Sequence, residues 1–366
     1  MSDREPAADR VARDPAHLRT QRSNPDRLDW LALQLAGALR AAPTTEALRD
    51  AGSPRLALAR LPARARPTAK AVRAAAQRIA DRGVTFLGWG TEGYPRRLAP
   101  LVDAPPVLGV RGHPEVLSRD AVAIVGSRAA TAYGLGVARR LAAALAEAGL
   151  VVVSGLAYGV DAAAHRGCLS AGGTTVAVQA CGLDAVYPAR HRALADEIAA
   201  TGAVVSEFAP GQRPRRAFFP LRNRLISGLA RAVVVVEARE RSGSLTTARH
   251  AAEQGVEVFA VPGPIDGASH RGSNGLLREG AAPLLEPADL LDALAWPRVE
   301  VPEAAPSPPA GPADRVLRRL AHEGADTETL AAILALPLES LAATLLELEL
   351  AGRIERERDG RWRLRA

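Results

Sequence analysis

The sequence is poor in cysteine and in long apolar runs. Cys168 and Cys181 are its only cysteines, which excludes a disulfide framework and a four-cysteine zinc site. No run reaches the roughly eighteen apolar residues that a membrane-spanning helix needs. The charged N-terminal segment also lacks the apolar stretch of a secretory signal. These absences predict a cytoplasmic protein that does not associate with a membrane.

The phosphate-binding signatures of common nucleotide enzymes are absent too. The chain has neither G-x-x-x-x-G-K-[ST] nor G-x-G-x-x-G, so the sequence does not support NTP hydrolysis or dinucleotide binding. It also has no carboxylate cluster suited to two metal ions. We therefore expect no cofactor, no metal site and no catalytic residue.

Basic residues are in excess, and almost all of them are arginine. The formal net charge is +7, the excess lies in the N-terminal third, and Lys70 is the only lysine. This balance is compatible with a polyanionic partner but does not identify one. The preference for arginine is most simply read as genomic composition.

The chain divides by composition into five segments. Apolar residues recur at helical spacing after Leu28, short β-branched runs dominate the middle of the chain, and a stretch rich in proline and alanine follows. The predicted segments are a disordered arm (1–27), a small helical domain (28–83), a Rossmann-like core with its lead-in (84–296), a Pro/Ala linker (297–313) and a winged-helix-like domain (314–366).

The middle segment predicts a doubly wound α/β domain with a parallel sheet. Its β-branched runs are almost entirely apolar and alternate with amphipathic stretches, which is typical of strands covered by helices on both faces. The six runs are VAIV (122–125), VVV (151–153), TVAV (175–178), AVV (203–205), VVVV (233–236) and VFAV (258–261).

The last segment predicts three helices followed by a short hairpin, as in a winged helix. Such modules often bind duplex DNA through the third helix. Here that helix, 337–351, carries Glu339, Glu347 and Glu349 and no basic residue. The expected DNA surface thus lacks the attraction to phosphate that dominates DNA affinity, which slightly favours a protein contact over DNA binding.

Turns of small residues follow the first two strands of the predicted sheet. Gly126 permits a tight turn, the backbone N–H of Ser127 is expected to face a phosphate, and Arg128 offers a two-pronged phosphate donor. An ordinary strand-to-helix turn explains the same residues. Gly155 begins a similar turn, and the Asp161 that follows is better explained as a helix cap beside His165 than as half of an acid/base or metal pair.

The segment RPRRAFFPLRNRLISGL (213–229) is the most informative. It holds five arginines interleaved with Phe218 and Phe219 and no acidic residue. Arginines beside a ring on which a base can stack are what single-stranded nucleic acid binding requires. The alternative is a core phenylalanine pair beside a solvated basic loop. Adjacent side chains of an extended segment point to opposite sides, so we expect one of the two rings to face the core.

With these motifs in place, the chain resembles the DprA/Smf family. The motifs VAIVGSR, SGLAYGVDAAAH, FPLRNRLISGL and VVVVEARERSGSLTTARHAAEQG stand in the order and approximate spacing of that family over roughly residues 84–295. The resemblance implies a Rossmann-like fold that binds single-stranded DNA, forms homodimers, and loads the RecA recombinase during natural transformation and homologous recombination.

The resemblance also implies site residues. Arg128, Arg216 and Phe219 match the family's phosphate-binding and base-stacking positions, and Arg216 stands where many members have lysine. The residues predicted to contact DNA are Gly126, Ser127, Arg128, Gly155, Arg216, Phe219, Arg222, Asn223, Arg224, Ser242, Gly243 and Ser244.

Two other functions remain as alternatives. The first is a Rossmann-like enzyme that hydrolyses nucleoside monophosphates, but the comparable turn, SGSLTTARHAAE, has no Glu at the spacing that such enzymes use. The second is a small-nucleotide sensor, which leaves the arginine and phenylalanine segment unexplained. A non-catalytic binder of single-stranded DNA accounts for the most residues.

Overall fold

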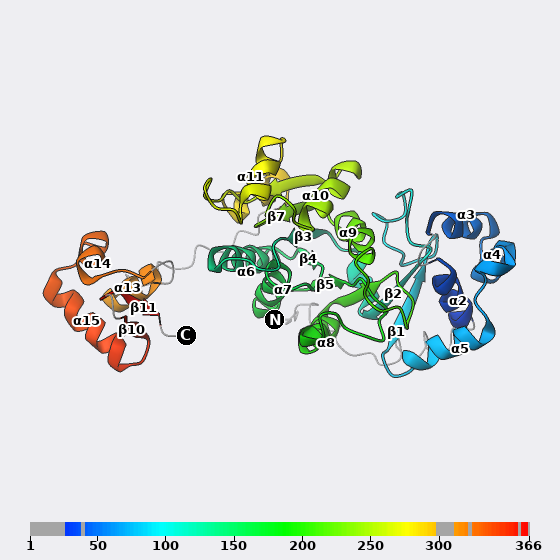
Figure 1. Ribbon diagram of the computed structural model, residues 1–366, viewed down its shortest axis with the longest axis horizontal. Helices are drawn as coiled ribbons and strands as arrows, with labels where there is room; N and C mark the ends of the chain where they lie inside the picture. Colours follow the sequence, from blue (N-terminus) through cyan, green and yellow to red (C-terminus); the bar gives the residue numbers. More distant parts are fainter. Residues whose placement is uncertain (1–25, 38–40, 298–310, 321–323, 358–359, 365–366) are drawn as a thin grey trace, which may run out of the picture. The chain divides into compact units, whose positions relative to one another are not determined.

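The computed structural model describes residues 26–37, 41–297, 311–320, 324–357 and 360–364. These residues form two compact units, one within Met1–Pro297 and one within Arg298–Ala366 (Figure 1). The predicted disordered arm, apart from its last two residues, and most of the predicted linker lie outside the described residues.

The first unit is built on one nine-stranded, mostly parallel sheet. The strands lie in the order β1-β2-β6-β5-β4-β3-β7-β8-β9, and the run from β6 to β9 is parallel. The parallel strands are β3 (Ala121–Val125), β4 (Val151–Ser154), β5 (Thr175–Val178), β6 (Ala203–Ser206), β7 (Ala232–Val235), β8 (Glu257–Ala260) and β9 (Ala282–Pro283). The six predicted strands and the doubly wound fold class are confirmed.

Two strands at one edge extend the predicted sheet in the opposite direction. β1 (Val84–Gly88) pairs antiparallel with β2 (Val107–Gly112), and β2 pairs antiparallel with β6. They belong to the lead-in of the predicted core, where the sequence alternation is too short to indicate a strand.

The strands are apolar on both faces because helices cover both sides of the sheet. Alternate residues of one strand enter different cores: Ala123 and Val125 of β3 lie in one, and Val122 and Ile124 lie in the other. The first face is covered by α9 (Phe218–Gly228) and α10 (Ser244–Glu253), and the second by α6 (Ala132–Glu147), α7 (Val160–Ser170), α8 (Arg192–Thr201) and α12 (Pro287–Ala293). The helix α11 (Arg271–Arg278) lies beside β8.

Four N-terminal helices pack beside the antiparallel edge of the sheet, as the blue and cyan segments of Figure 1 show. Trp30 and Leu33 share a core with Val107 of β2, and Gly88 leaves room for the indole ring of Trp30. Ser53 and Thr68 cap two of these helices by accepting a backbone N–H. The four helices are α2 (Arg27–Gly37), α3 (Ala41–Ala51), α4 (Pro54–Arg60) and α5 (Ala69–Arg78).

The second unit has three helices and a two-stranded hairpin around its own core. Leu330, Leu341, Leu345 and Trp362 are buried in that core. Its elements are α13 (Pro312–Leu320), α14 (Thr327–Leu334), α15 (Leu338–Leu350), β10 (Ile354–Arg356) and β11 (Trp362–Leu364). The predicted arrangement is confirmed, although α13 begins at Pro312, inside the predicted linker; proline is favoured in the first turn of a helix.

Among the described residues, no single helix has both the length and the apolar character needed to cross a membrane. Only α14 and α15 taken together would meet those criteria, and they are bent by 116° at the break between them.

Candidate functional site

The turns that follow β3, β4 and β7 meet at one edge of the sheet. β3 lies between β4 and β7, so the strand order reverses there, and ligands of open α/β sheets bind beyond the carboxyl ends of strands at such a point. Val160 N donates to Ser127 O at 3.1 Å, and Ser127 N donates to Glu237 O at 2.7 Å. These two hydrogen bonds join the three turns at this edge.

Gly126 is required for this convergence. A side chain at Gly126 would lie 2.6 Å from Val160 Cγ2 and 3.0 Å from the Glu237 carbonyl oxygen. Any larger residue would push the turns apart. The glycine therefore closes the turn, and its contact with DNA stays a prediction.

The expectation that the Ser127 amide faces a phosphate is wrong. That N–H donates to the Glu237 carbonyl, and Ser127 itself is buried. The N-terminus of α6 is also occupied, because the Glu237 carboxylate accepts hydrogen bonds from Thr131 N at 3.1 Å and Thr131 Oγ1 at 2.7 Å. A carboxylate of the protein thus fills the place where dinucleotide-binding folds hold a phosphate.

Phe218 and Phe219 open α9, so they do not lie in the extended segment that the sequence predicted. Their side chains nevertheless diverge, because successive helix positions are rotated by about 100°. Phe218 is buried and stacks on Phe208, with ring centroids 4.3 Å apart. Phe219 is half-buried, and the guanidinium carbon of Arg128 lies 4.9 Å from its ring centroid. The expectation that one ring faces the core is confirmed for Phe218.

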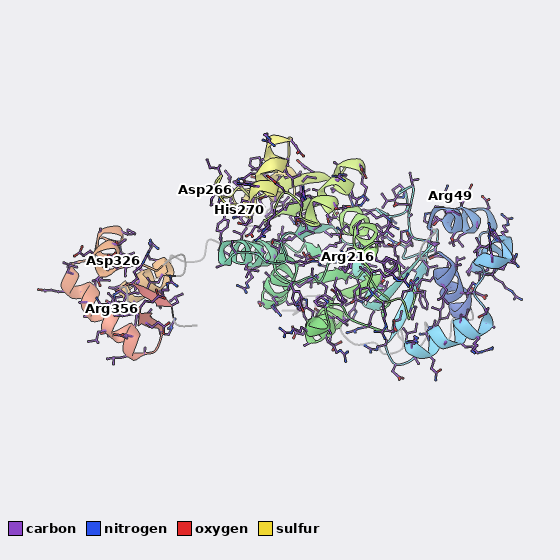
Figure 2. The ribbon with its side chains drawn as sticks, in the orientation of Figure 1. Arg49, Arg216, Asp266, His270, Asp326 and Arg356 are labelled. Atoms are coloured by element: carbon purple, nitrogen blue, oxygen red, sulfur yellow. The ribbon has the colours of Figure 1, made fainter. Side chains whose placement is uncertain are left out.

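Four exposed arginines lie on the two segments that lead to this site. Arg128 follows β3, while Arg213, Arg215 and Arg216 precede α9, and all four are exposed. Figure 2 shows Arg216 in the green, central part of the first unit. Within the described part of the chain, none of these four arginines forms an ion pair with an acidic side chain. Their charges are therefore available to an anionic ligand.

Arg222 lies in the interior, so its predicted contact with DNA is replaced by internal ones. Its Nη1 donates to Gly155 O at 2.6 Å and to Val178 O. Burial lowers the pKa of Arg222 to about 10, an effect that the charge of Asp161 opposes. The side chain thus ties α9 to the carboxyl ends of β4 and β5, and the Gly155 carbonyl is already in use.

Arg224 is buried between two carboxylates. Its Nε lies 2.7 Å from Asp103 Oδ2, and its Nη2 donates to Glu207 Oε2 at 2.6 Å. Burial raises the pKa of Glu207 to about 7, while the neighbouring Arg224 lowers it. The guanidinium of Arg224 holds α9 to β6 and the lead-in, which corrects its predicted contact with phosphate.

Asn223 joins the two motifs that the sequence analysis singled out. Its Nδ2 donates to Gly243 O at 3.1 Å, which holds the middle of α9 against the turn before α10. Ser242 Oγ and Ser244 Oγ lie 2.7 Å apart, and Ser244 N donates to Ser242 Oγ at 3.3 Å. The two serines thus hydrogen-bond to each other, and of Ser242, Gly243 and Ser244 only Gly243 is exposed.

Asp161 and His165 do not form an acid/base or metal pair. Asp161 Oδ2 accepts from Ala157 N at 3.2 Å. His165 is fully buried, and its Nδ1 lies 2.7 Å from Thr175 Oγ1, which donates its own hydrogen to Val152 O. Nδ1 is therefore the protonated nitrogen, and burial lowers the pKa of His165 to about 3. Among the described residues, no group of three His, Cys, Asp or Glu side chains is arranged to hold a metal ion.

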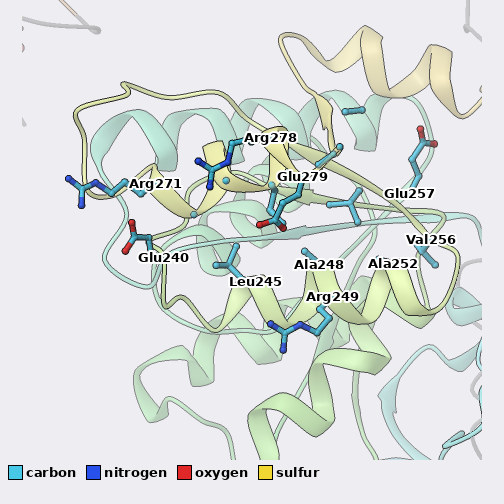
Figure 3. A pocket seen from close by; sticks show the side chains of 17 residues that line it. Glu240, Leu245, Ala248, Arg249, Ala252, Val256, Glu257, Arg271, Arg278 and Glu279 are labelled. Atoms are coloured by element: carbon cyan, nitrogen blue, oxygen red, sulfur yellow. The ribbon is translucent and has the colours of Figure 1, made fainter.

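A pocket of about 790 Å³ lies elsewhere, between α10, α11 and the last strands of the sheet (Figure 3). Arg249, Arg278, Glu257 and Glu279 line it together with Leu276, so it mixes both charge signs. None of the predicted DNA-contacting residues borders this pocket. The exposed arginines and Phe219 are thus a separate, open surface.

Two family profiles match the chain. The profile described as DNA recombination-mediator protein A covers residues 85–295, and the DprA winged helix domain covers residues 300–360. The chain belongs to the DprA/Smf family. It is a DNA-processing protein of that family, and its C-terminal unit is the family's winged helix domain.

Relatives and solved structures agree with this membership. The Smf protein of Escherichia coli K12 is 40% identical over 284 residues, which cover 75% of this chain and 76% of the relative. The X-ray structure of DprA from Streptococcus pneumoniae matches with a TM-score of 0.59 and 33% identity, covering 76% of this chain and 96% of that one. A Helicobacter pylori DprA structure, described by its single-stranded DNA binding mode, matches with a TM-score of 0.53 and 32% identity over 58% of this chain and 95% of that one.

Proposed function

We propose that this DprA/Smf protein binds single-stranded DNA without sequence preference through Arg128, Arg216 and Phe219. The observation that carries the proposal is the pairing of an exposed guanidinium with a half-buried ring: the guanidinium carbon of Arg128 lies 4.9 Å from the Phe219 ring centroid, and no acidic side chain among the described residues forms an ion pair with Arg128. Arginines hold the phosphates, and the ring stacks on a base. Every base has a π-face, so such a site tolerates any sequence.

The buried arginines support the proposal by holding the surface in place. Arg222 and Arg224 fix the interior face of α9, and Asn223 holds the middle of the helix to the turn at Gly243. Phe219, in the first turn of α9, is therefore presented by a helix that is held in place. A preorganised ring loses little side-chain entropy when a base stacks on it.

Titration of labelled oligothymidine at several salt concentrations tests the proposal. We expect affinity to rise with oligonucleotide length, to fall with salt on a log-log plot because phosphate contacts release counterions, and to be similar for mixed sequences. Thymidine monophosphate, as the matched single-base control, should bind far more weakly. Equal affinity for the mononucleotide and the oligonucleotide, or a flat salt plot, would contradict the proposal.

We also propose that the protein acts without catalysis. The Glu237 carboxylate is held by Thr131 at the start of α6, and burial shields Asp161. Neither is placed to act as a base on an exposed ligand. Assays for ATP hydrolysis, magnesium-dependent DNA cleavage and release of bases from nucleoside monophosphates should all give the buffer rate. Steady turnover that is lost in Glu237→Gln or Asp161→Asn would favour the enzyme alternative.

Homodimer formation and RecA loading during transformation and recombination are part of the same proposal. Their support is membership of the family and its recombination-mediator description. Light scattering at micromolar concentration should give twice the chain mass of 38.3 kDa. Addition of the protein should shorten the lag of RecA filament formation on oligothymidine. A monomeric mass or an unchanged lag would remove the corresponding part of the proposal.

A further inference from the structure

We propose that Tyr187 and Tyr158 continue the base-stacking surface beyond Phe219, so that the DNA strand crosses the carboxyl ends of β5 and β4. This inference rests on the proposed function. It adds two contact residues that the motifs did not indicate, and it assigns a direction to the bound strand.

Tyr187 lies directly beside Phe219. It follows β5, and its ring centroid is 5.8 Å from that of Phe219, with the two planes tilted by 56°. The residue is 45% exposed although its ring is largely apolar. The ring is therefore supported by Phe219 on one side and partly open to solvent, which is the arrangement that a base-stacking platform needs.

Tyr158 is held close to Arg128 by the loop after β4. Gly159 has a φ of +75°, and a side chain there would collide with the Ser127 carbonyl oxygen, so the loop closes tightly on the Arg128 turn. The Tyr158 ring packs edge-on against the buried His191, with centroids 4.9 Å apart, and His191 Nδ1 donates to Leu156 O at 2.8 Å. Tyr158 is thus 44% exposed on a rigid support.

The distribution of charge favours this direction. Arg190 is exposed near Tyr187, and Arg213, Arg215 and Arg216 precede Phe219. Asp184, the acidic residue of this loop, has a side chain only 13% exposed that pairs with Arg78 at 3.8 Å. A DNA backbone passing over Tyr187 therefore meets exposed cations.

The opposite direction from Phe219 is less suited to a polyanion. There, towards α10 and α11, exposed Glu240 and Asp266 are interspersed with exposed arginines. Figure 2 shows Asp266 and His270 in the yellow part of the ribbon, well separated from Arg216. A strand leaving Phe219 on this side would pass exposed carboxylates that lie among the arginines, which weakens the attraction to phosphate.

Oligothymidines of increasing length, titrated against tyrosine variants, test the inference. Stacking on an aromatic ring changes affinity by about fivefold to a hundredfold per base. We expect Tyr187→Ala and Tyr158→Ala each to lose affinity within that range for a long oligothymidine and to lose little for the shortest one that binds. Tyr187→Phe and Tyr158→Phe keep the ring and should bind like the unmodified protein.

Tyr133 offers a matched control. It is 50% exposed and packs edge-on against His270 with centroids 6.0 Å apart, but it lies on α6 and faces the α11 side. Tyr133→Ala should leave affinity unchanged at every length. A loss as large as that of Tyr158→Ala would overturn the proposed direction.

Crosslinking gives a second, independent readout. An oligonucleotide that carries 5-iododeoxyuridine should crosslink to peptides containing Tyr187 and Tyr158, as mapped by mass spectrometry. Circular dichroism should first show that both tyrosine-to-alanine variants are folded. If these variants bind long oligonucleotides normally while Arg128→Ala weakens binding, the inference fails and the proposed function stands. If the unmodified protein binds no oligonucleotide, the proposed function itself fails.

Discussion

Phe208 and Phe218 stack face to face in the interior, with ring centroids 4.3 Å apart and planes only 16° from parallel. The pair anchors the first turn of α9 to the segment that follows β6. The next residue, Phe219, is consequently turned towards the surface and Arg128. The two adjacent phenylalanines therefore lie in different surroundings: Phe218 is in the core, and Phe219 is at the surface where we propose that DNA binds.

Alanine substitutions at the two positions should separate these roles. Phe219→Ala should cost about 1–3 kcal/mol of single-strand binding free energy with little change in melting temperature, because a half-buried ring contributes little to the core. Phe218→Ala should cost about 3–5 kcal/mol of unfolding free energy, because it leaves a cavity beside Phe208. Thermal melts and oligothymidine titrations of both variants check this. An early melt with normal binding for Phe219→Ala would rule out the stacking role.

Arg128→Ala and Arg216→Ala should weaken DNA binding to a similar degree for all sequences. Each variant removes one phosphate contact, so the slope of log affinity against log salt should fall by about one. Fluorescence anisotropy at four or more salt concentrations measures the slope. Arg73→Ala, on the exposed surface of α5, serves as the control and should leave the slope unchanged. An unchanged slope in Arg128→Ala would show that its guanidinium does not contact phosphate.

Arg224→Ala should act on stability. Removing one member of the buried group formed with Glu207 and Asp103 leaves a carboxylate without its partner, at a cost of about 3–5 kcal/mol of unfolding free energy. Urea denaturation compares this variant with the exposed Arg216→Ala, for which we expect a change below about 0.5 kcal/mol. Similar urea midpoints for the two variants would be incompatible with the observed burial of Arg224.

The fully buried His165 should make the protein less stable as the pH falls. Its pKa is about 3 in the folded protein and 6.5 ordinarily, so the unfolded chain takes up a proton first. The contribution of neutral His165 to the unfolding free energy is present above pH 6.5. It declines by about 2 kcal/mol between pH 6.5 and pH 5. His165→Gln keeps a donor for Thr175 but does not titrate. Urea denaturation at both pH values should therefore show that the unmodified protein loses more unfolding free energy than His165→Gln. Equal losses in the two proteins would contradict the lowered pKa of His165.

The sequence by itself determined the fold class and most of the secondary structure. Apolar β-branched runs such as VVV (151–153) have no polar face, so they fit only a sheet that is covered on both sides. The third helix and the hairpin of the C-terminal unit were likewise predicted from the spacing of their apolar residues. β1 and β2 were missed because their stability comes from pairing with each other and, for β2, with β6, which is distant in the sequence.

Only the tertiary structure decided which of the arginines are exposed and which are buried. Arg216, Arg222 and Arg224 lie within nine residues of one another and are chemically identical, yet the first is exposed and the other two are buried. The difference depends on partners contributed by distant segments: Gly155 and Val178 for Arg222, and Asp103 and Glu207 for Arg224. Local sequence sets the charge of a side chain, whereas burial and pairing are set by whatever the fold brings next to it.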